Sequence, residues 1–376
     1  MNLQPRKLRV IISGGGTGGH IFPAIAIANA LKKINPASEF LFVGAKGRME
    51  MEKVPAAGYQ IEGLNISGIQ RKLSLGNLIL PLKVIQSILK AKKIIKKFSP
   101  DVAIGVGGYA SGPLLYAATA MKIPSLIQEQ NSFAGITNKI LSKRVQKICV
   151  AYEGMENFFP AEKIFLAGNP VREEMVSIEG KKLDALRFFG LEQNKKTILV
   201  IGGSLGARTI NESIEAGLKM FKENNLQLIW QTGKWFGERA RNAIAENSDK
   251  GIVTYEFIQR MDFAFAAADL IITRAGASTV SELALVSKPA ILVPSPNVAE
   301  DHQTKNAMAL VNKNAAILIK DSDAKVDLIN KTVDLIKDDN QLKSLSENIK
   351  KLAIKNSAGK IAEEIYKLVE GKRSQH

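Results

Sequence analysis

One pattern occurs near the start of each half of the chain: a short β-branched run ends in glycines and then opens into a helix. The first copy is 8–12 followed by the glycine-rich segment 13–20, and the second is 197–201 followed by segment 202–208. Such a unit begins a series of alternating strands and helices, which folds as a parallel sheet with helices on both faces. The two copies predict an α/β chain with two domains, and a length of 376 residues exceeds what one hydrophobic core usually serves.

Further apolar runs supply candidate strands for both series. They are 39–43, 102–106, 125–128 and 147–151 in the first half, and 226–231, 252–256, 270–273, 290–293 and 316–319 in the second. Glycine and proline in segment 168–172 mark the boundary, which gives domains 1–169 and 170–356. We expect a last amphipathic helix, about 357–376, to pack back on the first domain.

The charge balance favours anionic partners. The chain has 52 Lys and Arg residues against 36 Asp and Glu residues, a net charge of +16, which suits phosphorylated ligands, acidic lipid or nucleic acid. Aromatic residues make up only 6% of the chain, and no basic run is interleaved with aromatic residues that would stack on bases. The composition therefore disfavours nucleic acid.

The lone cysteine, Cys149, lies in an apolar run and predicts a buried strand residue rather than a disulfide, as in a reducing compartment. The N-terminus leads from a short basic tail into the first strand without the apolar core of a signal peptide. No stretch approaches the roughly 20 apolar residues of a membrane-spanning helix. We expect a cytoplasmic protein that can still touch a membrane surface.

The first glycine turn, 14–20, contains G-x-G-x-x-G and resembles a dinucleotide-binding fingerprint. A hydride-transfer enzyme usually has Asp or Glu at the end of the next strand, whereas here that strand ends Val43-Gly44-Ala45-Lys46. Only an NADP-type pocket around Lys46 and Arg48 would restore an oxidoreductase. Glycines at a helix N-terminus let backbone N–H groups approach an anion, so the two turns predict a diphosphate site, with tight packing turns as the alternative.

A third glycine turn, 274–282, again follows an apolar strand and opens a helix. Thr279 and Glu282 have the spacing of a capping box, in which Glu282 would only satisfy backbone donors. Alternatively, Glu282 binds the hydroxyls of a ribose while the helix N-terminus faces a diphosphate. The spacing leaves both interpretations open.

His20 closes the first glycine turn and is one of three histidines, with His302 and His376. A glycine-flanked turn is an unusual place for a core histidine, and imidazole accepts a proton near neutral pH. We predict a functional role for His20, with helix capping or ligand hydrogen bonding as the alternative. No Cys and His spacing indicates zinc, and no G-x-S-x-G motif indicates a hydrolase.

Several motifs, in order along the chain, together resemble those of one family. They are 14–20 (GGGTGGH), 105–113 (GVGGYASGP), 129–131 (EQN), 168–172 (GNPVR), 202–204 with 206–208 (GGS and GAR), and 301–307 (DHQTKNA). The chain is similar to the MurG family of peptidoglycan N-acetylglucosaminyltransferases, and the resemblance covers essentially its whole length.

The resemblance implies a GT-B architecture, two Rossmann-like domains with parallel sheets facing across a cleft. It implies inverting transfer of N-acetylglucosamine from UDP-N-acetylglucosamine to the 4-hydroxyl of lipid I, undecaprenyl-diphosphate-N-acetylmuramoyl-pentapeptide, to give lipid II. The first domain would face the membrane and the acceptor, and the second would bind the UDP-sugar. Matched motif by motif, the donor site would comprise Thr17, Gly18, Gly19, Asn131, Arg172, Ser204, Ile258, Ala277, Ser278, Thr279, Val280, Ser281, Glu282 and Gln303.

The chain departs from the family at two positions. Gln128 stands where the family commonly has His, and Leu205 stands where it has Gln. The first departure removes one candidate general base and leaves His20 and Glu129 as the expected catalytic residues. One of them would take the acceptor proton while UDP leaves in line, and helix N-termini would stabilise the diphosphate. UDP-N-acetylglucosamine would be a substrate, and we expect neither a cofactor nor a tightly bound metal ion.

The segment 83–97 contains six lysines and no acidic residue, with apolar residues at largely helical spacing. The pattern is typical of an interfacial helix that binds anionic phospholipid, and equally of a core helix whose lysines are solvated. The resemblance implies peripheral binding at the cytoplasmic face of the membrane, with other cell-wall synthesis proteins as further partners. Another GT-B lipid glycosyltransferase and, less favoured, an NADP-dependent oxidoreductase remain the alternative functions.

Overall fold

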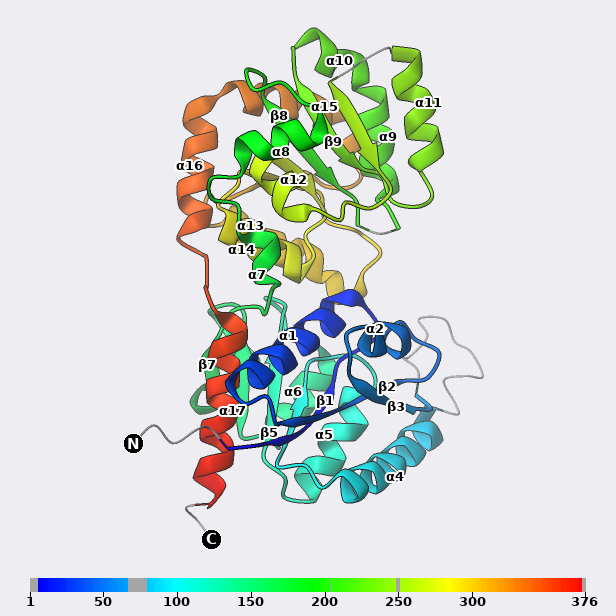
Figure 1. Cartoon of the computed structure of the whole chain (residues 1–376), viewed down its shortest axis with the longest axis vertical. Helices are drawn as coiled ribbons and strands as arrows, with labels where there is room; N and C mark the ends of the chain where they lie inside the picture. Colours follow the sequence, from blue (N-terminus) through cyan, green and yellow to red (C-terminus); the bar gives the residue numbers. More distant parts are fainter. Residues whose placement is uncertain (1–5, 67–79, 204, 248–250, 374–376) are drawn as a thin grey trace. The chain divides into compact units, whose positions relative to one another are not determined.

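The computed structural model describes residues 6–66, 80–203, 205–247 and 251–373 of the chain. The chain divides into two compact units, each built on its own parallel sheet (Figure 1). Unit 1 comprises Met1–Val171 and Lys355–His376, and unit 2 comprises Arg172–Ile354.

Unit 1 contains a seven-stranded sheet in the order β3-β2-β1-β4-β5-β6-β7, and every strand pair is parallel. Its strands are β1 (Arg9–Ser13), β2 (Glu39–Ala45), β3 (Gln60–Leu64), β4 (Val102–Gly105), β5 (Ser125–Glu129), β6 (Lys147–Val150) and β7 (Ile164–Leu166). Its helices are α1 (Gly18–Ile34), α2 (Glu50–Ala56), α4 (Leu80–Phe98), α5 (Ser111–Ala120), α6 (Ile136–Ser142) and α17 (Ser357–Arg373), with 3-10 turns η1 (Met155–Asn157) and η2 (Ala161–Lys163). The predicted strands are confirmed, while the edge strands β3 and β7 were not predicted because they are short and only partly buried.

Both faces of the unit 1 sheet are covered, as parallel sheets require. Alternate residues of the central strands pack against α4, α5 and α6 on one face and against α1 and α17 on the other. Cys149 is a fully buried residue of β6, as predicted, and burial raises the pKa of its thiol. The last helix, α17, returns to unit 1 and packs on α1 (Figure 1) through the buried side chains of Ile361 and Ile365.

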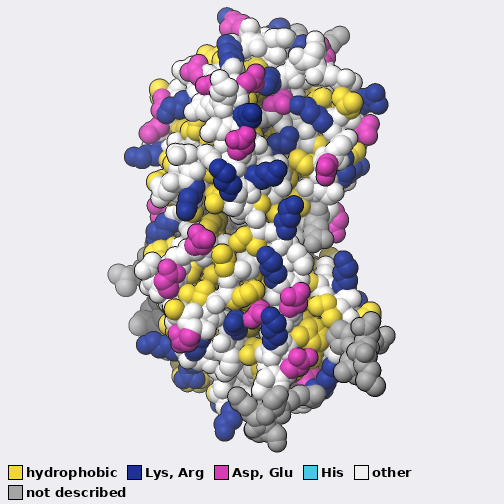
Figure 2. Space-filling view, turned by 90° about the vertical axis from the view of Figure 1, so that its left-hand side faces the viewer, with side chains coloured by type: hydrophobic (Ala, Val, Ile, Leu, Met, Phe, Trp, Pro, Cys, Tyr) yellow, Lys and Arg dark blue, Asp and Glu magenta, His cyan; other side chains and the backbone are white. Residues whose placement is uncertain are grey.

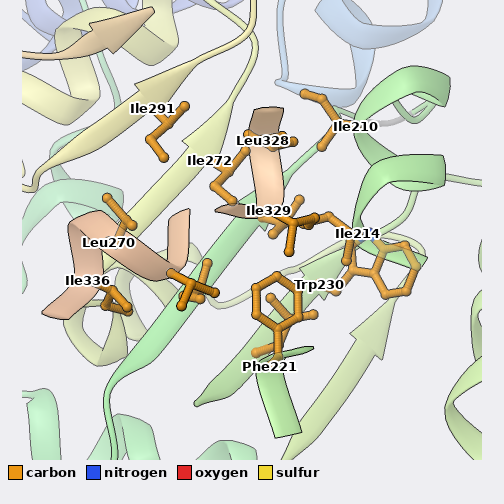
Figure 3. Close-up of a cluster of buried hydrophobic side chains, with 14 of the residues drawn as sticks. Ile210, Ile214, Phe221, Trp230, Leu270, Ile272, Ile291, Leu328, Ile329 and Ile336 are labelled. Atoms are coloured by element: carbon orange, nitrogen blue, oxygen red, sulfur yellow. The ribbon is translucent and has the colours of Figure 1, made fainter. Parts of the chain in front are cut away.

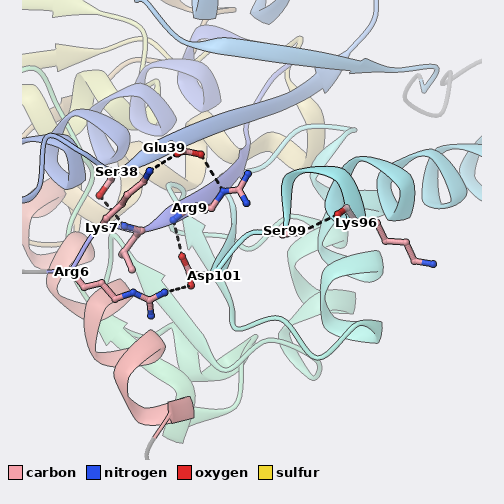
Figure 4. A network of polar contacts seen from close by, with 9 residues as sticks. Arg6, Lys7, Arg9, Ser38, Glu39, Lys96, Ser99 and Asp101 are labelled. Atoms are coloured by element: carbon pink, nitrogen blue, oxygen red, sulfur yellow. Dashed lines mark hydrogen bonds and ion pairs between the residues drawn. The ribbon is translucent and has the colours of Figure 1, made fainter.

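Polar contacts join the amino ends of β1, β2 and β4 (Figure 4). The Arg9 N–H donates to Asp101 Oδ2 at 2.8 Å, and the Arg9 guanidinium pairs with Glu39 at 3.1 Å. Leu8 N–H donates to Ser38 Oγ at 3.1 Å. An exposed ion pair such as Arg9–Glu39 is worth about 0–1 kcal/mol, so it helps to align the strand ends and adds little to stability.

Unit 2 contains a six-stranded sheet in the order β10-β9-β8-β11-β12-β13, again with parallel pairs. Its strands are β8 (Thr197–Ile201), β9 (Gln227–Gln231), β10 (Ile252–Tyr255), β11 (Leu270–Thr273), β12 (Ala290–Leu292) and β13 (Ile317–Leu318). Its helices are α7 (Glu173–Val176), α8 (Lys182–Phe189), α9 (Arg208–Ala216), α10 (Leu218–Glu223), α11 (Gly237–Asn247), α12 (Met261–Ala267), α13 (Ala277–Val286), α14 (His302–Val311), α15 (Ala324–Lys337) and α16 (Asp339–Lys350), with the 3-10 turn η3 (Ala299–Asp301). All five further strands predicted for this half are confirmed within two residues.

The core of unit 2 gathers around Trp230 of β9, whose side chain is completely buried. Isoleucine and leucine side chains of the neighbouring strands and of α9 and α15 surround it, together with Phe221 of α10 (Figure 3). Burying a large apolar side chain stabilises the fold by about 1.5–3 kcal/mol. This core fixes the strand ends from which the turns of unit 2 project.

Each sheet has one topological switch point, where successive strands begin to be added on the opposite side. In unit 1 it lies between β1 and β4, and in unit 2 between β8 and β11. In open α/β sheets, ligands bind at the carboxyl ends of the strands beside such a point. The three glycine turns predicted from the sequence follow β1, β8 and β11. Both switch points are therefore lined by these turns.

Charged side chains of both signs lie on the surface. On the face drawn in Figure 2, Lys and Arg side chains are spread over both units, with Asp and Glu side chains among them. None of the helices in the described ranges combines the length and apolarity needed to cross a bilayer.

Candidate functional site

The switch point of unit 1 is a contact between two glycine loops, one after β1 and one after β4. Gly15 N–H donates to the carbonyl oxygen of Gly107 at 3.3 Å, and Val106 N–H donates to that of Ser13 at 2.7 Å. Gly108 has φ +87°, and a Cβ there would lie 2.4 Å from the Gly15 carbonyl oxygen. Only glycine fits such a close approach of two backbones.

His20 lies in the first turn of α1, next to Gly15 and Gly107. Its Nδ1 is 2.9 Å from the Gly15 carbonyl oxygen, so Nδ1 carries the proton and donates, which leaves the lone pair on Nε2. The ring packs against Gly107, where a Cβ would lie 2.5 Å from the imidazole Cδ2. Burial lowers the pKa of His20 below its ordinary value, opposed by the hydrogen bond to Gly15 and by the charges of Glu129 and Glu50. A half-buried, oriented imidazole with a basic Nε2 is suited to accept a proton.

Glu129, at the end of β5, is buried and has its carboxylate surrounded by donors. Oε1 accepts from the backbone and side-chain N–H groups of Asn131, at 3.1 and 3.2 Å. Oε2 accepts from Gly135 N–H at 3.1 Å and from Asn138 Nδ2 at 2.8 Å. A carboxylate with four donors shapes the loop 130–135 and acts on His20 through its charge, so the geometry favours positioning over direct proton transfer.

Gln128, which replaces the family's His, points into the interior. Its side chain is fully buried, donates to Asn169 Oδ1 at 3.1 Å and accepts from the Gln130 amide. Asn169 Nδ2 in turn donates to the Gln130 carbonyl oxygen at 2.9 Å. These amides join β5 to the Gly168–Asn169 turn, and no proton acceptor of imidazole type is present at this position.

Of the remaining donor-site residues expected in unit 1, Thr17, Gly18 and Gly19 lie beside His20. Thr17 is the N-cap residue of α1, and its hydroxyl is 3.4 Å from His20 Nδ1. Asn131 lies beyond β5 and is oriented by Glu129. The structure thus groups these residues around the carboxyl ends of β1, β4 and β5.

In unit 2 the turn after β8 packs tightly on the loop after β9. A Cβ on Gly233 would lie 2.1 Å from the Gly206 N atom, and Asn211 Nδ2 donates to the Thr232 carbonyl oxygen at 2.7 Å. Ser204, an expected diphosphate ligand, lies outside the described residues. Leu205, which replaces the family's Gln, is 68% exposed.

The turn after β11 tests whether Glu282 belongs to a capping box. Helix α13 begins after the N-cap residue Gly276, and in the described chain no side chain caps it. Thr279 is therefore in the first turn and Glu282 in the second, so the capping-box interpretation is wrong. The other predicted residues of this turn, Ala277, Ser278, Val280 and Ser281, form the start of α13, where the helix dipole is positive.

Burial raises the pKa of Glu282 to about 7, and the positive charge of Arg172 opposes this increase. The charge of Arg172 therefore acts on Glu282, and both residues belong to the donor site that the resemblance implies. A carboxylate held in a partly desolvated position is a strong acceptor for hydroxyl groups.

Ile258 follows β10, and Gln303 is the second residue of α14, which follows β12. Gln303 Oε1 accepts from Ser295 N–H at 2.8 Å, so its NH₂ group is the part that can donate to a ligand. Ile258 is buried, and its N–H donates to Gln231 Oε1 at 3.1 Å. Its backbone is held in place by β9.

Sequence reasoning missed an ion pair that ties the loops of unit 2 together. Arg274 contacts Asp321 and donates to the carbonyl oxygen of Val293 at 3.0 Å, while Asp321 Oδ2 accepts from Thr209 at 2.9 Å. Asp321 and Asp323 have D-x-D spacing, but Asp321 is used by these contacts and Asp323 accepts from Ser322. Across the described ranges no group of three His, Cys, Asp or Glu residues is placed to hold a metal ion, and independence from metal stays a prediction.

Comparison with known proteins identifies both halves of the chain. Residues 10–150 match the glycosyltransferase family 28 N-terminal domain, and residues 197–365 match the glycosyltransferase family 28 C-terminal domain.

Full-length relatives carry one name, "UDP-N-acetylglucosamine--N-acetylmuramyl-(pentapeptide) pyrophosphoryl-undecaprenol N-acetylglucosamine transferase". The protein of this name from Parabacteroides distasonis is 56% identical over 98% of this chain and 100% of its own length, and that from Phocaeicola vulgatus is 57% identical over 98% and 99%. The crystal structure of Acinetobacter baumannii MurG is similar with a TM-score of 0.79 and 29% identity, over 96% of this chain and 100% of that one. A UDP-GlcNAc 2-epimerase from Neisseria meningitidis shares the fold, with a TM-score of 0.67 at 17% identity over 96% of this chain and 100% of that one.

The packing of His20 on Gly107 predicts a measurable change in its titration. We expect the pKa of His20 to lie below its ordinary value and to rise toward it in Gly107→Ala, because the added Cβ displaces the ring from its buried position. NMR titration of the imidazole protons measures both values, with His302→Gln and His376→Gln used for assignment. Gly47→Ala is the control, since Gly47 also has positive φ (+68°) but open space around it. An unchanged His20 titration in Gly107→Ala would contradict the geometry.

The raised pKa of Glu282 predicts that the free energy of unfolding of unit 2 depends on pH. Because its pKa is raised in the folded state, the unfolded chain loses this proton first as pH rises, and stability falls between about pH 4.5 and 7. Glu282→Gln removes the effect, so we expect unit 2 to be about 1–3 kcal/mol more stable than wild type at pH 8, with the difference vanishing near pH 4.5. Both tryptophans, Trp230 and Trp235, lie in unit 2, so urea unfolding followed by tryptophan fluorescence reports on it.

The matched control is Glu347→Gln on the exposed side of α16, for which no such difference is expected. If Glu282→Gln is less stable than wild type at pH 8, Glu282 makes compensating contacts and the prediction is wrong.

Proposed function

The chain belongs to the MurG family within glycosyltransferase family 28, and from that premise we propose how its residues carry out the reaction. The enzyme transfers N-acetylglucosamine from UDP-N-acetylglucosamine to lipid I, giving lipid II in peptidoglycan synthesis. The observation that carries this function is the full-length identity of 56–57% to relatives with this activity in their names. This identity favours the MurG function over the two alternatives, another lipid glycosyltransferase and an NADP-dependent oxidoreductase.

His20 is the general base of the proposed mechanism. Its Nδ1 is committed to the Gly15 carbonyl oxygen, so Nε2 takes the proton of the acceptor 4-hydroxyl as that oxygen attacks the anomeric carbon. The bond from the anomeric carbon to the diphosphate oxygen breaks at the same time, and UDP leaves with the electron pair. One displacement in line inverts the anomeric centre.

The turns of unit 2 bind the donor in this proposal. The N-termini of α9 and α13 supply backbone N–H groups and positive helix-dipole charge to the diphosphate, which becomes more negative as the bond breaks. Glu282 accepts from the ribose hydroxyls, and Arg172 and Gln303 complete the donor contacts. Thr17, Gly18, Gly19 and Asn131 of unit 1 contact the sugar side of the donor. Unit 1 accordingly takes the acceptor, and unit 2 takes the UDP-sugar.

A release assay tests the reaction and the base together. We expect wild-type protein to release UDP from UDP-N-acetylglucosamine only when a soluble lipid I analogue is present. His20→Ala should lower kcat by about 10²–10⁴-fold, the contribution typical of a general base, with little change in the KM for the donor. Gln303→Ala is the contrasting variant, because loss of a donor contact should raise the donor KM. Full turnover by His20→Ala would remove it from the base role.

We also propose that the α4–α6 layer of unit 1 binds the membrane. One side of α4 packs on the core through residues such as Ala91 and Ile95, which fits the core-helix interpretation of segment 83–97. Its other side exposes Leu82, Ile85 and Leu89 to more than half of their surface, followed by exposed lysines. This side fits the interfacial interpretation, because apolar side chains bordered by lysines suit an anionic lipid surface.

Helix α6 adds to the same layer. It packs on α5, which packs on α4, and it exposes Ile136 and Ile140 by 62% and 66%. A peripheral site of this kind would bring the enzyme to its lipid-linked acceptor at the cytoplasmic face of the membrane.

Vesicle co-sedimentation tests the surface. Replacing Lys92, Lys93, Lys96 and Lys97 by Glu should weaken binding to vesicles rich in phosphatidylglycerol by at least about 100-fold, since each basic residue near the surface contributes about 1 kcal/mol. The matched control makes the same charge change on exposed lysines of unit 2, namely Lys313, Lys343, Lys350 and Lys351. Equal losses in both variants would mean that only net charge matters, and no loss in the first would refute the surface.

A further inference from the structure

Glu50 is a buried carboxylate that the mechanism above does not use. It is the first residue of α2 and is only 1% exposed. In the described ranges no Lys or Arg forms an ion pair with it, and its partners are backbone N–H groups: Oε1 accepts from Ala45 and Oε2 from Gly16, both at 2.9 Å. A carboxylate buried without a cation is costly unless its hydrogen bonds are complete, so its place calls for an explanation.

Two glycines make room for this carboxylate. A Cβ on Gly15 would lie 2.3 Å from Glu50 Oε1, and a Cβ on Gly44 would lie 2.5 Å from Glu50 Cγ. Gly15 of the first glycine turn therefore makes room for the Glu50 side chain, and not only for a bound ligand.

The Gly15–Gly16 peptide group connects Glu50 to His20. Its N–H, on Gly16, donates to Glu50 Oε2, and its carbonyl oxygen, on Gly15, accepts from His20 Nδ1 at 2.9 Å. A carboxylate that accepts from one end of a peptide group polarises it and strengthens its carbonyl as an acceptor. The order carboxylate, peptide, imidazole resembles the carboxylate–imidazole pair of a serine protease triad, with one peptide group inserted.

We propose that Glu50, the Gly15–Gly16 peptide and His20 form a hydrogen-bonded relay, in which Glu50 is a positioning residue that orients the imidazole and stabilises its cation. The relay rests on the proposed function, since it serves the base of that reaction. When Nε2 takes the proton of the acceptor hydroxyl, the imidazolium keeps its Nδ1 proton on the Gly15 carbonyl oxygen, and Glu50 takes no proton. Glu50 from α2 and Glu129 from β5 are the charged groups facing His20 in the described part of unit 1, and both favour its protonated form.

The test compares Glu50→Gln with Glu52→Gln, an exposed residue of the same helix. Glu50→Gln should lower kcat about 10–100-fold and leave the donor KM within about twofold. It should also move the acid limb of the kcat/KM profile to lower pH, because the imidazolium loses a stabilising charge. Glu50→Asp, which keeps the charge, should recover part of the activity, and Glu52→Gln should match wild type.

A double-mutant cycle separates the relay from a structural role. In the His20→Ala background Glu50→Gln should have little further effect, because the two residues act as a unit. An undiminished effect in that background, or wild-type kcat and pH profile in Glu50→Gln, would overturn the relay.

NMR titration of His20 without substrate distinguishes failure of the relay from failure of the proposed function. A lower His20 pKa in Glu50→Gln than in wild type supports the relay even if no lipid I analogue turns over. An unchanged pKa in a folded Glu50→Gln, with thermal unfolding as the check on folding, counts against the relay alone.

Discussion

The candidate site in each unit depends on loops that touch backbone to backbone at the carboxyl ends of parallel strands. In unit 1 the Gly15 and Gly107–Gly108 backbones lie in contact, and in unit 2 Gly206 lies against Gly233. No side chain fits between these loops, so their separation is fixed by backbone atoms alone. Because hydrogen-bonded strands and a packed core hold the loops from below, the groups that they carry are held in nearly one geometry.

Two buried carboxylates give the loops of unit 1 their shape. Glu129 collects N–H groups from the loop after β5, and Glu50 collects them from β2 and the first glycine turn. Glu282 differs, since burial raises its pKa and it has Arg172 nearby. The first two carboxylates organise the protein around His20, whereas the third carries an energetic penalty that a ligand with hydroxyl groups would relieve.

The sequence predicted the parts of this arrangement that are formed by residues close together in the chain. A β-branched run, a glycine turn and a helix are contiguous, so both sheets and all three turns were predictable. Glu50 was not, because its partner Gly16 is distant in the chain and meets it only through the packing of α2 on β2. The capping box failed because α13 begins at Ala277 with Gly276 as its N-cap residue, and the spacing of Thr279 and Glu282 does not reveal this start. For α4, the sequence left two interpretations open because exposure of Leu82 and Ile85 depends on which side of the helix the core of unit 1 takes.

The return of α17 to unit 1 has a consequence for biosynthesis. Ile361, Ala362, Ile365 and Val369 complete the core against α1, yet they are made after the whole of unit 2. On the ribosome, unit 2 can finish folding as soon as its last helix emerges, whereas the older unit keeps an apolar groove uncovered until α17 has emerged. The part of the protein that is synthesised first is therefore the part that matures last, and a chain cut short before α17 would expose that groove to chaperones and proteases.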